Sequence, residues 1–295
     1  MHEGLRRVTA NGIDFAYLDG GPPDGPLALC LHGFPDHAPT WRHLLPVLGG
    51  AGFHAVAPWM RGYHPSGLAP DGNYELAALA KDACDLADVL AGDRGAVLIG
   101  HDWGAAAAYL AGAYRPDRFS KVVTLAVPPA QLFVQAFLER PEQLKRSWYM
   151  FFFQHPLADV AVPANDLAFI DMLWKDWSPG FDVDPQFMKA LKATLSAPGS
   201  LSAAIGYYRA MLGTPASTPD PALDEVRAAI GRAMPVPTLY LQGENDGCFA
   251  HDMVDPSALA AVGIDYQLAP DAGHFLQLER PEDVNRRILE FLRAP

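Results

Sequence analysis

The chain has 295 residues, of which half are hydrophobic and 19% are charged. This balance is typical of a soluble globular enzyme with one large α/β domain, or with a core domain that carries an insertion. The formal net charge of −12 argues against nucleic acid and anionic membrane surfaces as partners. Cys30, Cys84 and Cys248 are far apart and form no CxxC pair. Neither a disulfide framework nor a zinc site is therefore expected.

Nothing in the sequence indicates a targeting or membrane segment. Residues 1–7 carry charges that are not followed by an apolar stretch, which is not typical of a signal peptide. No apolar run approaches the ~20 residues that cross a bilayer. The cytoplasm is therefore the expected location.

The spacing of apolar residues predicts alternating strands and helices. Residues 5–19 alternate around Asn11-Gly12, which predicts a β-hairpin. The further strands are expected at residues 27–31, 53–57, 97–99, 121–127, 238–241 and 264–268, and helices at 74–90 and 281–292. Strands that alternate with helices predict an α/β fold with a mainly parallel central sheet.

The strand pattern pauses in the middle of the chain. Residues 130–231 are rich in aromatic side chains at helical spacing, broken by Pro- and Gly-containing turns. We interpret this region as a helical cap inserted into a core domain made of residues 1–129 and 232–295. The alternative is that these helices simply extend the core.

The most informative motif lies at residues 100–104, which read Gly-His-Asp-Trp-Gly. A short apolar strand leads into it and an alanine-rich helical stretch follows, which is the pattern of a nucleophile elbow, G-x-Nuc-x-G. The apex residue is Asp102 rather than serine. A carboxylate at this point can attack an electrophilic carbon and form an ester that water then cleaves. The competing interpretation is that Asp102 only caps the helix.

An ester on Asp102 needs a general base to activate water, and histidine has a pKa suited to that role. His274 follows the last predicted strand, which is the position expected when the order along the chain is nucleophile, acid, histidine. Asp246 lies just beyond the strand at 238–241 and is the expected acid. Glu244 is the competing candidate for this acid. The alternative for Glu244 is a solvent-exposed charge in the loop.

Backbone N–H groups should stabilise the anion that forms during hydrolysis. One is expected from Trp103, directly after the nucleophile, and one from Phe34 in the His32-Gly33-Phe34-Pro35 loop. The alternative for this loop is an ordinary tight turn.

These motifs together resemble the α/β-hydrolase superfamily and, within it, the epoxide hydrolases. The matching segments are His32 to Pro35, Arg61-Gly62-Tyr63, Gly100 to Ala105, Asp246 and Gly273-His274-Phe275. The resemblance implies an α/β-hydrolase fold with a helical cap. It also implies hydrolysis of an epoxide to a vicinal diol through a covalent ester on Asp102, without a cofactor or a metal.

The resemblance further implies two cap tyrosines that protonate the epoxide oxygen. Tyr149 fits the first, because it precedes Phe153-Gln154-His155-Pro156 by a few residues. Tyr208 fits the second, because it stands directly before Arg209. Tyr207 is expected to pack, since adjacent helical residues point about 100° apart. The expected pocket residues are Phe34, Trp103, Met150, Trp174 and Leu276.

Two other classes of function, a dehalogenase and a non-catalytic binding module, compete with epoxide hydrolysis. A haloalkane dehalogenase would use the same triad with the Trp103 indole as a halide donor, and Trp148 or Trp174 would have to supply a second donor, because the Phe34 side chain cannot. A fluoroacetate dehalogenase is disfavoured, because residues 103–106 contain no arginine. A non-catalytic binding module is the third class, and the intact triad argues against it. The expected partners are a small apolar epoxide and water.

Overall fold

The computed structural model describes residues 5–213 and 220–294. Eight strands form one sheet in the order β1-β2-β4-β3-β5-β6-β7-β8. The strands are β1 (Arg6–Ala10), β2 (Ile13–Gly20), β3 (Leu27–Leu31), β4 (His54–Pro58), β5 (Ala96–His101), β6 (Phe119–Leu125), β7 (Thr238–Gly243) and β8 (Ile264–Ala269). These positions confirm the predicted hairpin and the six strands expected after it.

The sheet is mostly parallel. β2 pairs antiparallel with both β1 and β4, whereas β4, β3, β5, β6, β7 and β8 are parallel neighbours. Every residue of β3, β4 and β5 is buried. Continuous burial is expected for parallel strands that are covered on both faces.

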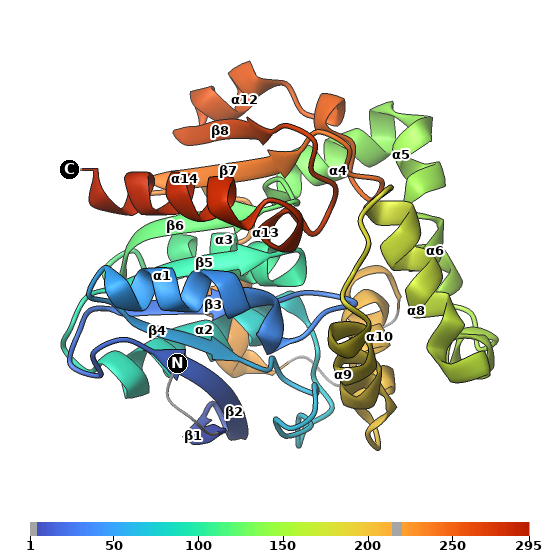
Figure 1. Cartoon of the computed structure of the whole chain (residues 1–295), viewed down its shortest axis with the longest axis horizontal. Coiled ribbons are helices and arrows are strands. Elements are labelled where there is room, and N and C mark those ends of the chain that lie inside the picture. Colours follow the sequence, from blue (N-terminus) through green and yellow to red (C-terminus); the bar gives the residue numbers. More distant parts are fainter. Residues whose placement is uncertain (1–4, 214–219, 295) are drawn as a thin grey trace.

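Helices cover both faces of the sheet (Figure 1). α1 (Leu44–Gly50) and α14 (Pro281–Arg293) contact each other on one face, and α2 (Leu76–Ala91) and α3 (Trp103–Tyr114) contact each other on the opposite face. α12 (Pro256–Ala261) packs beside β8. The predicted α/β architecture is therefore confirmed, including the helices expected at 74–90 and 281–292.

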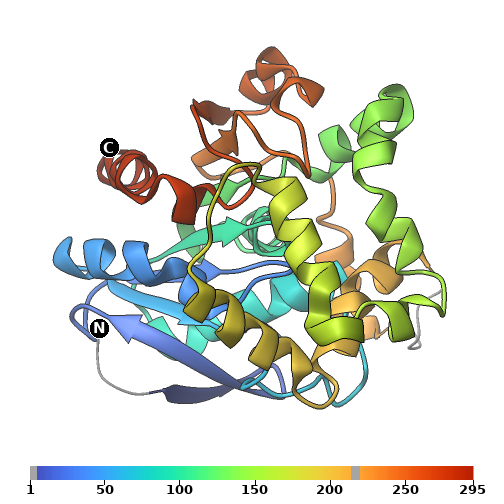
Figure 2. The same cartoon turned by 45° about the vertical axis from the view of Figure 1, so that its right-hand side comes forward.

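A group of helices stands between β6 and β7 in the chain. They are α4 (Ala130–Glu139), α5 (Pro141–Arg146), α6 (Trp148–Phe152), α7 (Ala158–Ala161), α8 (Ala164–Trp177), α9 (Pro185–Ser196), α10 (Ser200–Leu212) and α11 (Asp224–Arg227). Most of them lie to one side of the sheet, as two views show (Figures 1 and 2). Division of the chain at 129/130 and 231/232 stays a prediction.

The parallel strands direct their carboxyl ends toward these helices. β3, β5, β7 and β8 therefore end at the same edge of the sheet, where ligands of open α/β sheets bind. The short helix α13 (Leu276–Glu279) follows β8 at this edge. In the described part of the chain, no helix has the length and apolar character that crossing a membrane requires.

Candidate active site

The turn between β5 and α3 presents Asp102 at the sheet edge. The backbone of Asp102 has φ 53° and ψ −117°, a conformation that L-residues rarely adopt. A Cβ on Gly100 would lie 2.1 Å from the carbonyl oxygen of Gly104, and a Cβ on Gly104 would lie 2.2 Å from the carbonyl oxygen of Leu31. Only glycine fits at these two positions, so the sequence pattern reflects a sharp turn pressed against β3.

The carboxylate of Asp102 faces the loop after β3. Its Oδ1 accepts a hydrogen bond from the backbone N–H of Phe34 at 2.7 Å. The side chain makes no capping hydrogen bond to α3, although Asp102 occupies the position before the helix. A Cβ on Gly33 would lie 2.3 Å from Oδ1 of Asp102 and 2.7 Å from the backbone nitrogen of Trp103. The two predicted backbone donors therefore flank the same carboxylate.

His274 connects Asp102 with Asp246. Its Nδ1 lies 3.0 Å from Oδ2 of Asp246, and its Nε2 lies 3.7 Å from Oδ2 of Asp102. Asp246 is held in place because Oδ1 accepts from the backbone N–H groups of Cys248 and Phe249, at 2.7 and 3.0 Å. Glu244 is exposed, and its carboxylate accepts instead from the backbone N–H of Asp271. The structure thus brings Asp102, His274 and Asp246 together.

Two carboxylates control the charge of His274. The ring is fully buried, and burial alone would lower its pKa. The charges of Asp246 and Asp102 and the hydrogen bond with Asp246 outweigh burial and raise the pKa to about 10. His274 is therefore protonated at neutral pH while Asp102 carries its charge.

The predicted tyrosines line the same cavity as Asp102. Tyr149 and Tyr208 are buried with their rings 5.6 Å apart, and the ring of Tyr208 packs edge-on against Trp103. Oη of Tyr149 lies 3.4 Å from Sγ of Cys248. Oη of Tyr208 is buried and makes no hydrogen bond within the described structure. Burial raises the pKa of both phenols well above 10, so both carry a proton at neutral pH.

Tyr207 differs from its neighbour. Its Oη donates to the backbone carbonyl of Arg61 at 2.7 Å, and its ring stacks on Tyr74. Arg61 in turn binds the buried carboxylate of Asp82 through Nε and Nη2, at 2.6 and 2.7 Å. Tyr207 and Arg61 thus have structural partners, whereas Oη of Tyr208 remains available.

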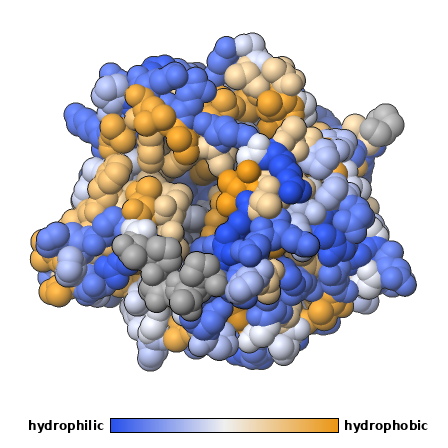
Figure 3. Space-filling model, turned by 180° about the vertical axis from the view of Figure 1, so that it is seen from behind, coloured by the Kyte–Doolittle hydropathy of each residue, from blue (hydrophilic) through white to orange (hydrophobic). Residues whose placement is uncertain are grey.

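An apolar cavity of about 130 Å³ contains the candidate catalytic groups. Asp102, Trp103, Tyr149, Tyr208 and Met150 line it. Figure 3 shows the face of the molecule opposite to that of Figure 1, where a central hollow is flanked by apolar residues.

Three of the expected pocket residues take other positions. Phe34, Trp174 and Leu276 are buried but are not among the residues that line this cavity. Trp174 stacks on Phe275 with ring centroids 3.5 Å apart, and its Nε1 donates to the carbonyl of Pro35 at 2.8 Å.

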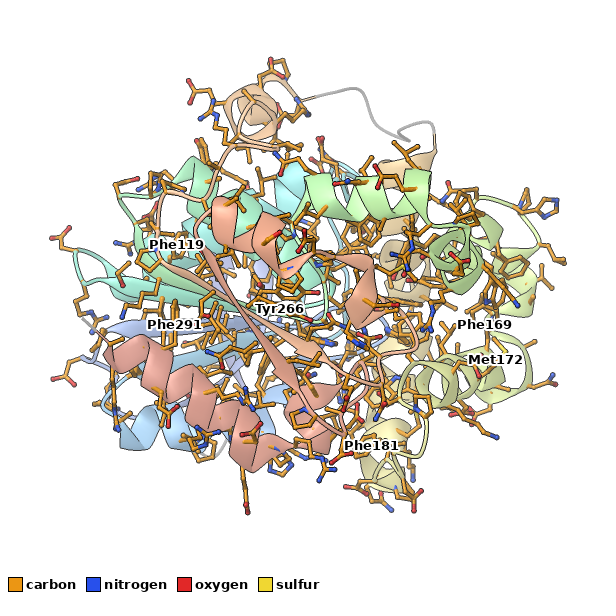
Figure 4. The ribbon with its side chains drawn as sticks, turned by 90° about the horizontal axis from the view of Figure 1, so that it is seen from above. Phe119, Phe169, Met172, Phe181, Tyr266 and Phe291 are labelled. Atoms are coloured by element: carbon orange, nitrogen blue, oxygen red, sulfur yellow. The ribbon has the colours of Figure 1, made fainter. Side chains whose placement is uncertain are left out.

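Some aromatic residues of the inserted helices pack away from the cavity that contains Asp102. Phe169 and Met172 of α8 lie at the end of the molecule opposite Phe119 and Phe291, which belong to the core (Figure 4). Phe169 stacks on Phe152. Packing accounts for these side chains, as the sequence analysis expects for most of the phenylalanines.

One buried acid beside the triad was not expected from the sequence. Asp36 is fully buried, and its Oδ2 lies 4.0 Å from Nδ1 of His101. Burial raises the pKa of Asp36 to about 8, and the charge of Asp102 adds to this effect. The only available signal was that Asp36 directly follows the His32 to Pro35 motif. His101 stays neutral, because burial lowers its pKa to about 3, and its Nε2 donates to the carbonyl of His274 at 2.9 Å.

One group in the described residues has the side-chain types of a metal site. Atoms of Asp246, Cys248 and His274 lie within 4.8 Å of one another. Both oxygens of Asp246 already accept hydrogen bonds, Oδ1 from two backbone N–H groups and Oδ2 from Gln242 and His274. Burial also raises the pKa of the Cys248 thiol, which opposes the thiolate that a metal requires. The arrangement fits a hydrogen-bonded triad better than a metal centre.

Comparison with known proteins agrees with this geometry. Residues 26–281 match the family model described as the alpha/beta hydrolase fold. Epoxide hydrolase 4 of Homo sapiens is 30% identical over 97% of this chain and 78% of its own length. Epoxide hydrolase 3 of Xenopus tropicalis is 31% identical over 98% of this chain and 77% of its own length. The crystal structure of epoxide hydrolase A from Mycobacterium thermoresistibile superposes with a TM-score of 0.80 at 26% identity, covering 99% of this chain and 98% of that one.

Proposed function

The chain belongs to the alpha/beta hydrolase family, and its relatives there include epoxide hydrolases; we propose that it converts an epoxide and water into a vicinal diol. The observation that carries the proposal is the placement of two buried phenols, Tyr149 and Tyr208, in the same cavity as the carboxylate of Asp102. An acid is needed at this point because opening an epoxide creates an alkoxide.

In the first step Asp102 attacks a carbon of the epoxide. Oδ1 is held by Phe34, so Oδ2 is the oxygen free to form the new C–O bond. The ring C–O bond breaks, and its electron pair goes to the epoxide oxygen, which takes a proton from Tyr149 or Tyr208. The product of this step is an ester of Asp102 that carries a neighbouring hydroxyl group.

In the second step His274 activates water against the ester carbonyl. Ester formation removes the charge of Asp102, which is one of the two charges that raise the pKa of His274. The pKa falls, so the ring gives its proton to the tyrosinate that the first step left, and the neutral ring can then accept a proton from water. The developing oxyanion on Oδ1 receives the N–H groups of Phe34 and Trp103. His274 then protonates the departing Oδ2, and the last proton of the water passes from the carboxyl group of Asp102 to His274, which restores the starting state.

The same geometry weakens the dehalogenase alternative. A second halide donor besides Trp103 would have to come from Trp148 or Trp174. The indole N–H of Trp174 already donates to Pro35. Trp148 is 42% exposed and is not among the residues that line the cavity with Asp102. A single indole donor would stabilise a departing halide poorly, whereas two phenols can protonate the oxygen of an opening epoxide.

We also propose that residues 130–231 act as the cap that supplies these phenols to the core, because α6 and α10 carry Tyr149 and Tyr208. The cytoplasm is the location we propose. The three cysteines are buried free thiols, which is usual in a reducing compartment.

The test is turnover of styrene oxide and 1-bromobutane by the purified protein. Diol without bromide is the expected result. Bromide without diol would indicate a dehalogenase instead. If neither product forms, and a wider panel of epoxides also gives no diol, a non-catalytic protein is favoured.

A His274→Gln variant separates the two steps. Asp102 should still attack the epoxide while hydrolysis stalls, so intact mass should increase by the mass of the substrate. The Asp102→Ala variant is the matched control and should gain no mass. Rapid turnover by His274→Gln without an adduct would contradict the role of His274 as the base.

A further inference from the structure

The cavity that contains Asp102 extends along one helix. Asp102, Ala106, Leu110 and Ala113 line it at spacings of four, four and three residues, which places them on one face of α3. Eleven residue steps correspond to roughly 16 Å of helix. A volume of about 130 Å³ spread over that length makes the cavity narrow.

Small side chains keep this channel open. Ala106 and Ala113 present only methyl groups to it, and a larger side chain at either position would enter the space. The rest of the wall comes from two segments that are distant in sequence, residues 127–131 and 229–231, which are apolar except for Gln131. The outer part of the channel reaches the surface beside Ile230, which is 49% exposed, and Met211, which is 42% exposed.

The inner part of the cavity is closed. Gln143 and Ser147 are almost completely buried there, and Nε2 of Gln143 donates to Oγ of Ser147 and to the carbonyl of Cys248. These hydrogen bonds hold the wall together behind Tyr149. Gln143, Ser147, Tyr149 and Cys248 are all buried.

The other side of Asp102 is filled by aromatic rings. Phe34 packs edge-on against Phe153 and Tyr208, with ring centroids 5.5 and 5.3 Å apart. Behind Phe34, Trp174 stacks on Phe275. The exposed residues that line the cavity belong to positions 130–131, 211 and 230–232, so the described lining opens to the surface there and not beside Asp102.

We propose that the substrate is a terminal epoxide with a single unbranched apolar chain that lies along α3, and that Ala106 and Ala113 set the chain length. This inference rests on the proposed epoxide hydrolase function and narrows its substrate class. A terminal epoxide places its ring at Asp102 and needs space for one chain. An internal epoxide carries a chain on each ring carbon and needs space for two. The narrow apolar wall favours methylene groups over branches or rings.

The first test compares two isomers, 1,2-epoxyoctane and trans-4,5-epoxyoctane, which contain the same atoms. The terminal isomer should have a kcat/KM at least tenfold higher, because the internal isomer cannot place its second alkyl arm. A ratio below tenfold would overturn the inference. If the protein opens no epoxide, including 1,2-epoxybutane, the proposed function fails instead, so the two failures are distinguishable.

The second test uses chain length as the readout. For terminal epoxides from four to ten carbons, kcat/KM should rise about three- to fourfold per added methylene while the chain remains inside the channel. In Ala113→Leu the rise should stop at a longer chain than in Ala106→Leu, because residue 113 lies farther from Asp102 along α3. The chain length at which the rise stops is the measured quantity.

The matched control is Ala190→Leu, which makes the same change at an exposed position of α9. It should leave the chain-length profile as in the natural protein. Thermal unfolding of all three variants identifies any that fail to fold. If Ala106→Leu is unstable, Leu110→Ala gives the opposite test, since widening the channel should improve branched chains relative to straight ones. Equal profiles in all folded variants would overturn the inference.

Discussion

The backbone N–H of Phe34 lies 2.7 Å from Oδ1 of Asp102, whereas Oδ2 of the same carboxylate lies 3.7 Å from Nε2 of His274. The two oxygens therefore have different surroundings before any substrate binds. Oδ1 already occupies the place where an oxyanion will form, and Oδ2 lies on the side of the base. Attack through Oδ2 then leaves Oδ1 where its developing charge is stabilised.

The different roles of Oδ1 and Oδ2 predict where ¹⁸O from water is incorporated. In a single turnover in H2¹⁸O, with enzyme in excess, water attacks Cγ of Asp102, and Oδ2 leaves with the product. The first diol should therefore carry no ¹⁸O, and the peptide that contains Asp102 should gain one. Mass spectrometry of the diol and of the peptide measures both. Label in the first diol with none on the peptide would mean that water attacks the epoxide directly.

Gly33 is expected to be essential to this arrangement. A Cβ at residue 33 would lie 2.3 Å from Oδ1 of Asp102, so Gly33→Ala must displace the nucleophile or the loop. Displacement of about 1 Å costs on the order of 100-fold in rate, and we expect kcat/KM to fall by at least that factor. Gly50→Ala is the control, because a Cβ there meets nothing within 4 Å. Activity of Gly33→Ala within about threefold of the natural protein would contradict the placement of Asp102 against this loop.

The sequence predicted the core of the site because each of its parts is local. Gly100 and Gly104 mark a sharp turn, and His274 follows a strand at the sheet edge. The strands were found for the same reason, since apolar runs such as that of β3 are continuous in the sequence.

Contacts between distant segments could not be predicted from the sequence. The cavity wall brings residues 229–231 to α3, more than 100 positions earlier, and no periodicity reports such a contact. Trp174 was expected in the pocket, yet it stacks on Phe275. The burial of Asp36 likewise depends on tertiary packing, which the polar residue type does not reveal.

Adjacent tyrosines allow activity and stability to be separated. Oη of Tyr208 is buried and makes no hydrogen bond within the described structure, so Tyr208→Phe removes an unsatisfied polar group and should leave the free energy of unfolding unchanged or raise it. Loss of one of two acids should lower kcat/KM by about 10- to 100-fold. Tyr207→Phe should do the reverse, because it leaves the buried carbonyl of Arg61 without its donor, at a cost of about 1–3 kcal/mol.

Denaturant unfolding and epoxide turnover of the two variants check this pair of expectations. The same hydroxyl group is removed from neighbouring residues of α10, so a general effect of the substitution would appear in both variants. A larger loss of activity in Tyr207→Phe than in Tyr208→Phe would reverse the assignment of the two residues.

The charge of His274 predicts how stability depends on pH. Its pKa is raised from 6.5 to about 10 in the folded protein, so the fold favours the protonated ring. The stabilisation from this group is fully present below about pH 6.5 and is lost as the pH rises through about 10. In His274→Gln the group is absent, and the rest of the titrating groups are shared with the natural protein.

The difference in Tm between the natural protein and His274→Gln should therefore shrink steadily from pH 7 to pH 10. Exposed lysines and tyrosines titrate in both proteins and cancel in this difference. Thermal unfolding followed by circular dichroism at half-unit intervals of pH gives the curve. A difference that stays constant over this range, or grows, would show that His274 is neutral beside Asp102 and Asp246. In that case the base would be ready before the ester forms, and formation of the ester would not be needed to lower its pKa.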